Sequence, residues 1–312
     1  MSVFLSIVAP VFALILIGYL AGRFGLLSES AGQGVSDFAF SLGIPALLCR
    51  TIATAKFADL SPVGIWLSFF GAAGLTWIAA TIMTSAALRR PAADAPAIAM
   101  SSVFGNTAML GLPLAVTTFG PAAAAPIAVI LSIHAPLLWL TGMVHSRWVG
   151  QTAQVSGREL ALSLIRDLSR NPIIIGIMIG AAWRLTGTQL PLPVDRTLEL
   201  LAQAGVPASL VALGLTLVRF EVTGQVPTLL GITALKLVLM PLAAYILAEK
   251  ILALSPVSTG VVVILAAMPT GANAYLFANR EGRALNSASG AVALGTLLAA
   301  TTSAIVISIV RI

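Results

Sequence analysis

The stretch "GNTAMLGLP" (residues 105–113) lies inside a run, 95–119, that contains no charged residue. At 1.5 Å per residue such a run is long enough to cross the apolar core of a bilayer, about 30 Å thick. Yet its centre carries an amide, a hydroxyl, glycines and a proline. Pro113 lacks an N–H, and its ring clashes with the carbonyl four residues earlier, so the helix is predicted to kink or stop near Gly111.

The composition indicates an integral membrane protein. Hydrophobic residues make up 58% of the 312 residues and charged residues 9%, whereas soluble domains average about a quarter charged residues. The apolar runs do not alternate with polar residues as barrel strands do. We therefore expect an all-α membrane protein with ten transmembrane helices. The expected spans are 3–22, 35–54, 62–88, 95–119, 121–146, 171–185, 198–218, 226–248, 256–279 and 285–310.

The chain repeats its helix-breaking residues at an offset of 162 positions. The matching pairs are Pro10 and Pro172, Gly18 and Gly180, Gly25 and Gly187, Gly43 and Gly205, and Pro45 and Pro207. Each half holds five expected spans, and an odd number makes the second half enter the membrane from the opposite side. The sequence therefore predicts an inverted repeat, with a first half at 1–149, a cytoplasmic linker at 150–170 and a second half at 171–312.

Inverted repeats are characteristic of secondary transporters, whose substrate sites lie where interrupted helices of the two halves meet. The counterpart of the first stretch is "AAMPTGANAYLFA" (residues 266–278), in which Pro269 and Gly271 are expected to break span nine. A helix that restarts at a proline exposes backbone N–H donors, which attract anions. Neither stretch carries the carboxylate that a sodium or proton exchanger would place there. The alternative is a pair of ordinary proline kinks, satisfied by neighbouring helices.

These arguments give a set of candidate residues for an organic-anion site. The predicted substrate-binding residues are Asn106, Thr107, Gly111, Pro113, Pro269, Thr270, Gly271 and Asn273. Lys236 lies deep inside span eight and serves either as a counter-charge or coupling group or as a side chain that snorkels to the interface. His134 either carries coupling protons or forms a hydrogen bond between helices. Arg50 is expected at the membrane interface and receives no role.

Other functions lack a signature in the sequence. Cys49 is the single cysteine and there are two histidines, so no metal site and no cofactor are expected. No enzyme motif is present. The net charge of +6 sits in short loops, which indicates membrane topology rather than nucleic-acid binding. Ten basic residues on the odd-numbered loops against six on the others predict both termini on the periplasmic side of the inner membrane.

Five stretches together resemble the auxin efflux carrier family. They are "FAFSLGIPALLCRTI", "GNTAMLGLP", "RNPIIIGIMIG", "LKLVLMPLAA" and "MPTGANAYLFANREG", in chain order. That family joins plant auxin exporters to bacterial carriers of malonate and other organic acids. The resemblance implies that broken helices four and nine cross at the substrate site. It also implies a transport domain of spans 3–5 and 8–10 that moves like an elevator against a scaffold of spans 1, 2, 6 and 7, in a homodimer.

The chain differs from the plant exporters in lacking a long central hydrophilic loop and an ionisable residue in span three. The expectation is therefore a bacterial-type secondary transporter for a small organic anion, such as a carboxylate or auxin-like compound, within the lipid bilayer. Two alternatives remain open. One is a sodium- or proton-coupled symporter of bile-acid-carrier type, and the other is a membrane sensor that binds the ligand without moving it.

Overall fold

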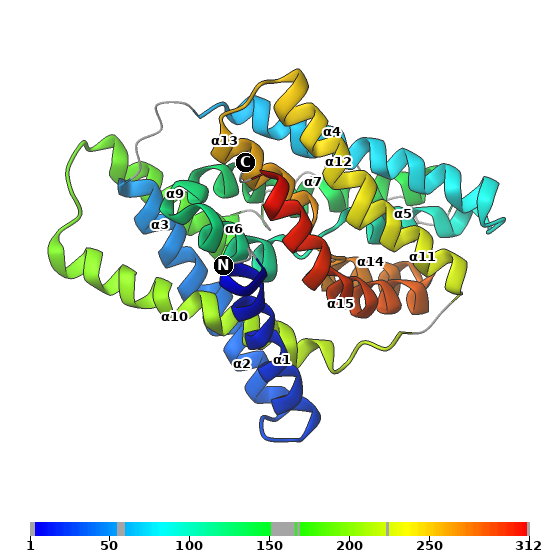
Figure 1. Cartoon of the computed structure of the whole chain (residues 1–312), viewed down its shortest axis with the longest axis horizontal. Helices are drawn as coiled ribbons and strands as arrows, with labels where there is room; N and C mark the ends of the chain where they lie inside the picture. The colour runs from blue at the N-terminus through cyan, green and yellow to red at the C-terminus, as the bar shows by residue number, and fades with distance from the viewer. Residues whose placement is uncertain (1–3, 55–59, 151–165, 167–168, 223–224, 311–312) are drawn as a thin grey trace. The chain divides into compact units, whose positions relative to one another are not determined.

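The structure, a computed structural model, describes residues 4–54, 60–150, 166, 169–222 and 225–310, and these are nearly all helical (Figure 1). The only extended pairing among them is an isolated bridge between Gly105 and Thr270. The α-helices are α1 (Ala9–Arg23), α2 (Glu29–Phe38), α3 (Ile44–Thr54), α4 (Pro62–Ile82), α5 (Ala95–Val103), α6 (Leu112–Phe119), α7 (Ala124–Trp148), α9 (Pro172–Leu185), α10 (Leu192–Leu217), α11 (Val226–Ala234), α12 (Met240–Tyr245), α13 (Pro256–Ala266), α14 (Ala272–Glu281) and α15 (Leu285–Val310).

Seven helical segments within the described ranges are long and apolar enough to cross a membrane, so the chain is a multi-pass membrane protein. Two further apolar helices, Pro172–Leu185 and Pro256–Ala266, are shorter. The all-α membrane class is therefore confirmed, whereas the count of ten spans stays a prediction. The seven segments are Ser6–Arg23, Glu29–Thr54, Pro62–Ala87, Thr107–Trp148, Leu192–Leu217, Val226–Ile251 and Leu285–Val310.

Local sequence explains where several helices begin. α4 and α13 each start at a Ser-Pro pair, in which the serine hydroxyl accepts a hydrogen bond from a first-turn N–H and the proline follows it. Ser61 accepts from Gly64, and Ser255 accepts from Ser258. A proline fits at this position because the first-turn N–H groups have no partner within the helix.

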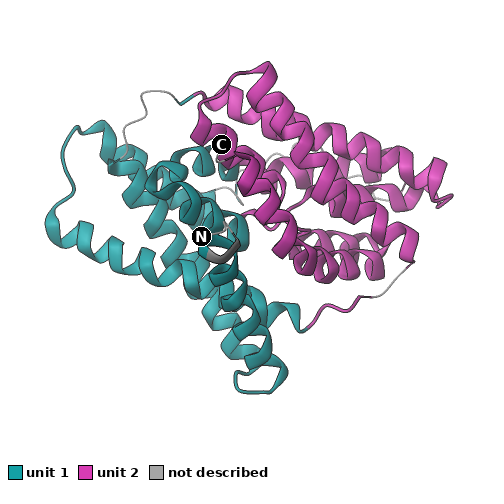
Figure 2. Cartoon of the chain, in the orientation of Figure 1, with its two compact units in different colours: residues 1–60, 108–132, 158–218 teal, residues 61–107, 133–157, 219–312 magenta. Residues whose placement is uncertain are grey.

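The chain divides into two compact units, shown in Figure 2. Unit 1 comprises residues 1–60, 108–132 and 158–218, and unit 2 comprises residues 61–107, 133–157 and 219–312. The chain passes from unit 2 to unit 1 immediately after Thr107. The boundaries of the units therefore differ from those of the two sequence halves. The predicted linker at 150–170 lies largely outside the described residues.

Within unit 1, α1 packs on α10, and α3 packs on α9 and α10. Glycines permit these close approaches, as small residues do in membrane helices generally. A Cβ on Gly180 would lie 2.5 Å from the Cys49 carbonyl oxygen, and a Cβ on Gly18 would collide with the Val211 backbone. Gly43 and Gly205 face each other in the same way. Gly18 and Gly180 thus lie where helices pack too closely for a larger side chain.

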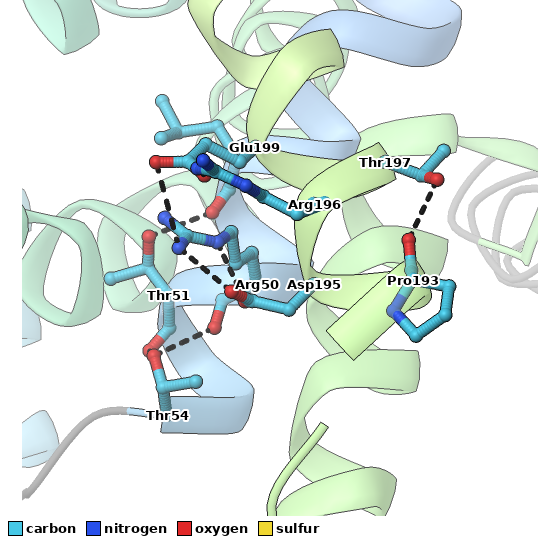
Figure 3. A network of polar contacts seen from close by, with 9 residues as sticks. Arg50, Thr51, Thr54, Pro193, Asp195, Arg196, Thr197 and Glu199 are labelled. Carbon is cyan, nitrogen blue, oxygen red and sulfur yellow. Dashed lines mark hydrogen bonds and ion pairs between the residues drawn. The ribbon is translucent and has the colours of Figure 1, made fainter. Parts of the chain in front are cut away.

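A charged network also links α3 to α10 in unit 1 (Figure 3). The Arg50 guanidinium donates from Nε to Asp195 Oδ1 at 2.7 Å and from Nη2 to Asp195 Oδ2 at 3.0 Å. Glu199 lies 3.8 Å from Arg50 Nη2 and also pairs with Arg196. Such a two-bond geometry is the strong form of an arginine–carboxylate pair. Arg50 therefore has a structural partner that the sequence did not indicate.

The glycine contacts of unit 1 give a first testable prediction. Gly43→Ala should destabilise the protein by about 1–3 kcal/mol, because an added methyl group meets backbone that cannot move aside. Gly34→Ala is the matched control, since Gly34 lies exposed on α2 and a Cβ there meets nothing within 4 Å. Thermal unfolding in detergent measures both variants. Equal melting temperatures for the two would contradict the close approach.

Candidate functional site

The expected break in span four is present, but it lies earlier in the sequence than predicted. α5 ends at Val103, Phe104 is extended (φ −72°, ψ 95°), and helix resumes as the π-helix η5 (Thr107–Gly111). The prediction of a kink or stop near Gly111 was therefore wrong in position. Pro113 lies in the first turn of α6, directly after the wider π-helical turns. At this position its missing N–H disturbs the helix less than it would in the interior of an α-helix.

The break in span nine lies where Pro269 and Gly271 predicted it. α13 ends at Ala266, Gly271 is extended (φ −88°, ψ 158°), and α14 begins at Ala272. The ninth predicted span is thus two helices joined by a short extended segment. Both broken segments, 104–106 and 269–271, belong to unit 2.

These two extended segments pair with each other, and together they are called the crossing below. Asn106 N–H donates to the Pro269 carbonyl at 2.7 Å, and Gly271 N–H donates to the Phe104 carbonyl at 2.9 Å. Gly105 and Thr270 face each other between these two bonds. A Cβ on Gly271 would lie 3.1 Å from the Gly105 oxygen, so the close approach of the two backbones favours glycine there.

A side chain from another segment satisfies one carbonyl near the end of each broken helix. Near the end of α5, the Ser101 carbonyl accepts a 2.8 Å hydrogen bond from the Thr270 hydroxyl. At the end of α13, the Ala266 carbonyl accepts a 2.6 Å bond from Lys236 Nζ. Both donors are buried, with 2% of Thr270 and 1% of Lys236 exposed. Thr270, predicted as a substrate ligand, therefore uses its hydroxyl to hold the broken backbone.

The donors at the crossing, by contrast, are left open. Within the described part of the chain, the backbone N–H groups of Gly105 and Thr270 make no hydrogen bond, and Gly271 gives α14 no side-chain cap. Among the described residues the Asn106 amide and the Thr107 hydroxyl make no hydrogen bond, and their polar atoms are not among those fully buried without a partner. The carbonyls of Ser101 and Ala266 thus have side-chain partners, whereas the N–H groups of Gly105 and Thr270 have none among the described residues.

The remaining predicted residues are not part of the crossing. Asn273 is exposed in the first turn of α14. Gly111 and Pro113 are buried but belong to unit 1, whereas the crossing belongs to unit 2. Sequence reasoning did not single out Ser101, whose backbone carbonyl is the acceptor, because a backbone role leaves no side-chain signal.

His134 lies beside the crossing, in contact with one of its residues. The imidazole is 3% exposed, and its ring centre is 4.7 Å from that of Phe104 and 5.6 Å from that of Phe69, both edge-on. Its Nε2 atom has no hydrogen-bond partner among the described residues. The interhelical hydrogen bond considered as its structural role is therefore not made by this nitrogen.

Lys236 does not snorkel, because its ammonium is buried. It lies in the π-helix η7 (Leu235–Leu239), and Nζ also lies 3.1 Å from Met240 Sδ. No carboxylate forms an ion pair with it in the described part of the chain. No group of three or more His, Cys, Asp or Glu side chains that could hold a metal occurs among the described residues.

Several membrane-crossing helices and a pair of interrupted helices are features found in membrane transport proteins. The family model described as "Membrane transport protein" matches residues 3–307. The chain belongs to this family, the auxin efflux carrier family, which confirms the resemblance seen in its motifs.

Several known proteins are similar to the chain. The "Putative malonate transporter" of Rhizobium meliloti (strain 1021) is 27% identical over 301 residues, covering 95% of this chain and 92% of that protein. The "Uncharacterized transporter YfdV" of Escherichia coli (strain K12) is 22% identical over 95% of this chain and 94% of its own length. The "Lysosomal cholesterol signaling protein" of Mus musculus is 24% identical over 74% of this chain but 28% of its own length.

The hydroxyl of Thr270 gives a second prediction. Thr270→Val should destabilise the protein by about 1–3 kcal/mol, because the Ser101 carbonyl loses its donor in a buried environment. Thr270→Ser, which keeps the hydroxyl, should recover most of this loss. Thermal unfolding compares the two variants. A serine variant no more stable than the valine variant would show that the hydrogen bond contributes nothing.

Proposed function

We propose that the protein is a secondary active transporter for a small organic anion, with the substrate bound at the crossing. The observation that carries the proposal is a set of donors without acceptors among the described residues, the N–H groups of Gly105 and Thr270 and the Asn106 amide, beside a helix end that Lys236 already covers. Lys236 adds a positive charge beside Gly105 with no carboxylate partner in the described residues. An anion supplies both the acceptors and the compensating charge.

The residues of the crossing have different proposed roles. Asn106 and Thr107 bind substrate oxygens through the amide and hydroxyl, and the N–H groups of Gly105 and Thr270 provide backbone donors. Pro269 and Gly271 keep the second segment extended. Asn273, Gly111 and Pro113 are further candidate substrate-binding residues. His134 is the candidate coupling residue next to Phe104.

A carboxylate is the favoured substrate class. The relative from Rhizobium meliloti is named for malonate, a small dicarboxylate, and it covers nearly the whole chain. Carboxylate oxygens accept several hydrogen bonds at once, which matches a site built from N–H and amide donors. Auxin-like monocarboxylates are the second group to compare.

The proposed architecture is a ten-span inverted repeat. Contacts in unit 1 support it, because Gly18 meets Val211 and Gly180 meets Cys49, and these two pairs are related by the offset of 162. Gly43 and Gly205, separated by the same offset, meet each other. A two-fold relation between the halves would produce this pattern of reciprocal contacts.

The proposed mechanism is of elevator type, in which unit 2 carries the crossing and moves during alternating access. Unit 1 contains the predicted scaffold spans 1, 2, 6 and 7, together with residues 108–132, which the sequence had assigned to the transport domain. We further propose a homodimer in the inner membrane with both termini in the periplasm, as the charge distribution of the loops favours.

A substrate screen by thermal shift tests the function, and solute counterflow in proteoliposomes separates a carrier from a sensor. Mono- and dicarboxylates, auxin-like indoles and amino acids form the screen. An acid that stabilises the protein and exchanges across the membrane supports the proposal. Stabilisation without counterflow would favour the sensor.

The Asn106 amide gives a third prediction. Asn106→Ala should weaken binding of the stabilising acid by roughly 10-fold or more, since a buried hydrogen bond to a charged group contributes about 1.5–3 kcal/mol. Asn279→Ala is the control, because Asn279 is exposed on α14 and away from its first turn. Ligand-dependent thermal shift measures both affinities. Unchanged affinity in the folded Asn106 variant would remove this residue from the site.

A further inference from the structure

A buried lysine covers the interrupted end of α13. Lys236 Nζ donates to the Ala266 carbonyl at 2.6 Å and lies 3.1 Å from Met240 Sδ. Ala266 is the last residue of α13, and the final carbonyls of a helix have no partner within it and carry a partial negative charge. The ammonium group therefore lies at the partially negative C-terminal end of α13, next to the crossing.

The same side chain also contacts the other broken segment. A Cβ on Gly105 would lie 3.1 Å from both Cε and Nζ of Lys236, so the lysine packs against the backbone of Gly105. The ammonium is thus held between the end of α13 and residue 105, within unit 2. An added side chain at Gly105 would displace the lysine or be displaced by it.

In transporters with interrupted helices, unwound carbonyls and the C-terminal ends of half-helices are the groups that coordinate a coupling sodium ion. In this chain a covalently attached monovalent cation meets that helix end. We propose that Lys236 is a built-in cation that takes the place of a coupling sodium ion at the end of α13, so that the site needs no free sodium. The coupling role rests on the proposed carrier function, whereas the contacts of Lys236 with Ala266 and Gly105 are independent of it.

The ion pairs of unit 2 support this inference. Asp94, a buried acid of unit 2, pairs with Arg90 at 2.9 Å and lies 3.8 Å from Arg283, so its charge is already matched. Lys236 has no carboxylate partner among the described residues. A sodium ion entering beside it would meet a like charge without an acid to balance the two.

The first test uses the wild-type protein without substrate. Melting temperatures in sodium chloride and in choline chloride of equal ionic strength should differ by less than about 1 °C, because a cation without a site adds no binding free energy. A rise of several degrees in sodium would overturn the inference. Such a rise would indicate a sodium site, which fits a sodium-coupled carrier.

The second test removes the lysine side chain and supplies a cation from solution. Lys236→Ala should lower the melting temperature by about 5 °C or more, because the Ala266 carbonyl loses its donor and a cavity forms. Propylammonium chloride should restore much of the loss, and tetramethylammonium chloride, which has no N–H, should not. Lys250→Ala is the control, since Lys250 is exposed at the end of the π-helix η8 (Ile246–Ile251).

Each outcome of these tests either supports or contradicts the inference about Lys236. An unchanged melting temperature in Lys236→Ala, or equal effects of the two ammonium salts, would contradict the inference. If the alanine variant does not fold, the wild-type comparison of sodium with choline decides alone. No substrate is used in either test, so failure to find transport would contradict the proposed function without affecting these results.

Discussion

The structure of unit 2 depends on one constraint: backbone groups freed by a break in a membrane helix need partners from the protein, from water or from a bound guest, because the bilayer core offers none. At the crossing, two backbone hydrogen bonds join the extended segments, a threonine hydroxyl serves Ser101, and a lysine ammonium serves Ala266. These partners come from different parts of the chain. Loss of any one of these hydrogen bonds would leave a buried carbonyl without a donor. The two broken helices therefore depend on all of these bonds together.

The hydrogen bonding at the crossing pairs some of the freed backbone groups and leaves others unpaired, and this difference bears on function. The Ser101 and Ala266 carbonyls accept hydrogen bonds from side chains of the protein, whereas the N–H groups of Gly105 and Thr270 bond to no described residue. A guest with acceptor atoms completes the hydrogen bonding of these donors, and a guest with donor atoms does not. Selectivity for the class of ligand would then follow from the backbone itself, and side chains such as Asn106 would select within that class.

The sequence predicted the class of fold and the existence of both breaks, because helix breakers inside apolar runs have local causes. Pro269 lies at its break, but the break in span four is at residues 104–106 rather than near Gly111, since a proline in the first helical turn after π-helical turns disturbs little. The sequence could not reveal that Thr270 bonds to Ser101 or that Arg50 meets Asp195. Both contacts join segments far apart in the chain and depend on packing that no local pattern records.

The uncompensated charge of Lys236 also has an electrical consequence. A dicarboxylate bound beside it leaves a net charge of minus one in the site, and a monocarboxylate leaves none. The membrane potential acts on a moved elementary charge with about 2.3 kcal/mol per 100 mV. If the lysine travels with its cargo, the loaded carrier moves one negative charge with a dianion and none with a monoanion, so the membrane potential acts on the loaded step for the dianion alone. The empty carrier returns with the charge of the lysine in both cases, so the charge moved over a whole cycle is that of the substrate.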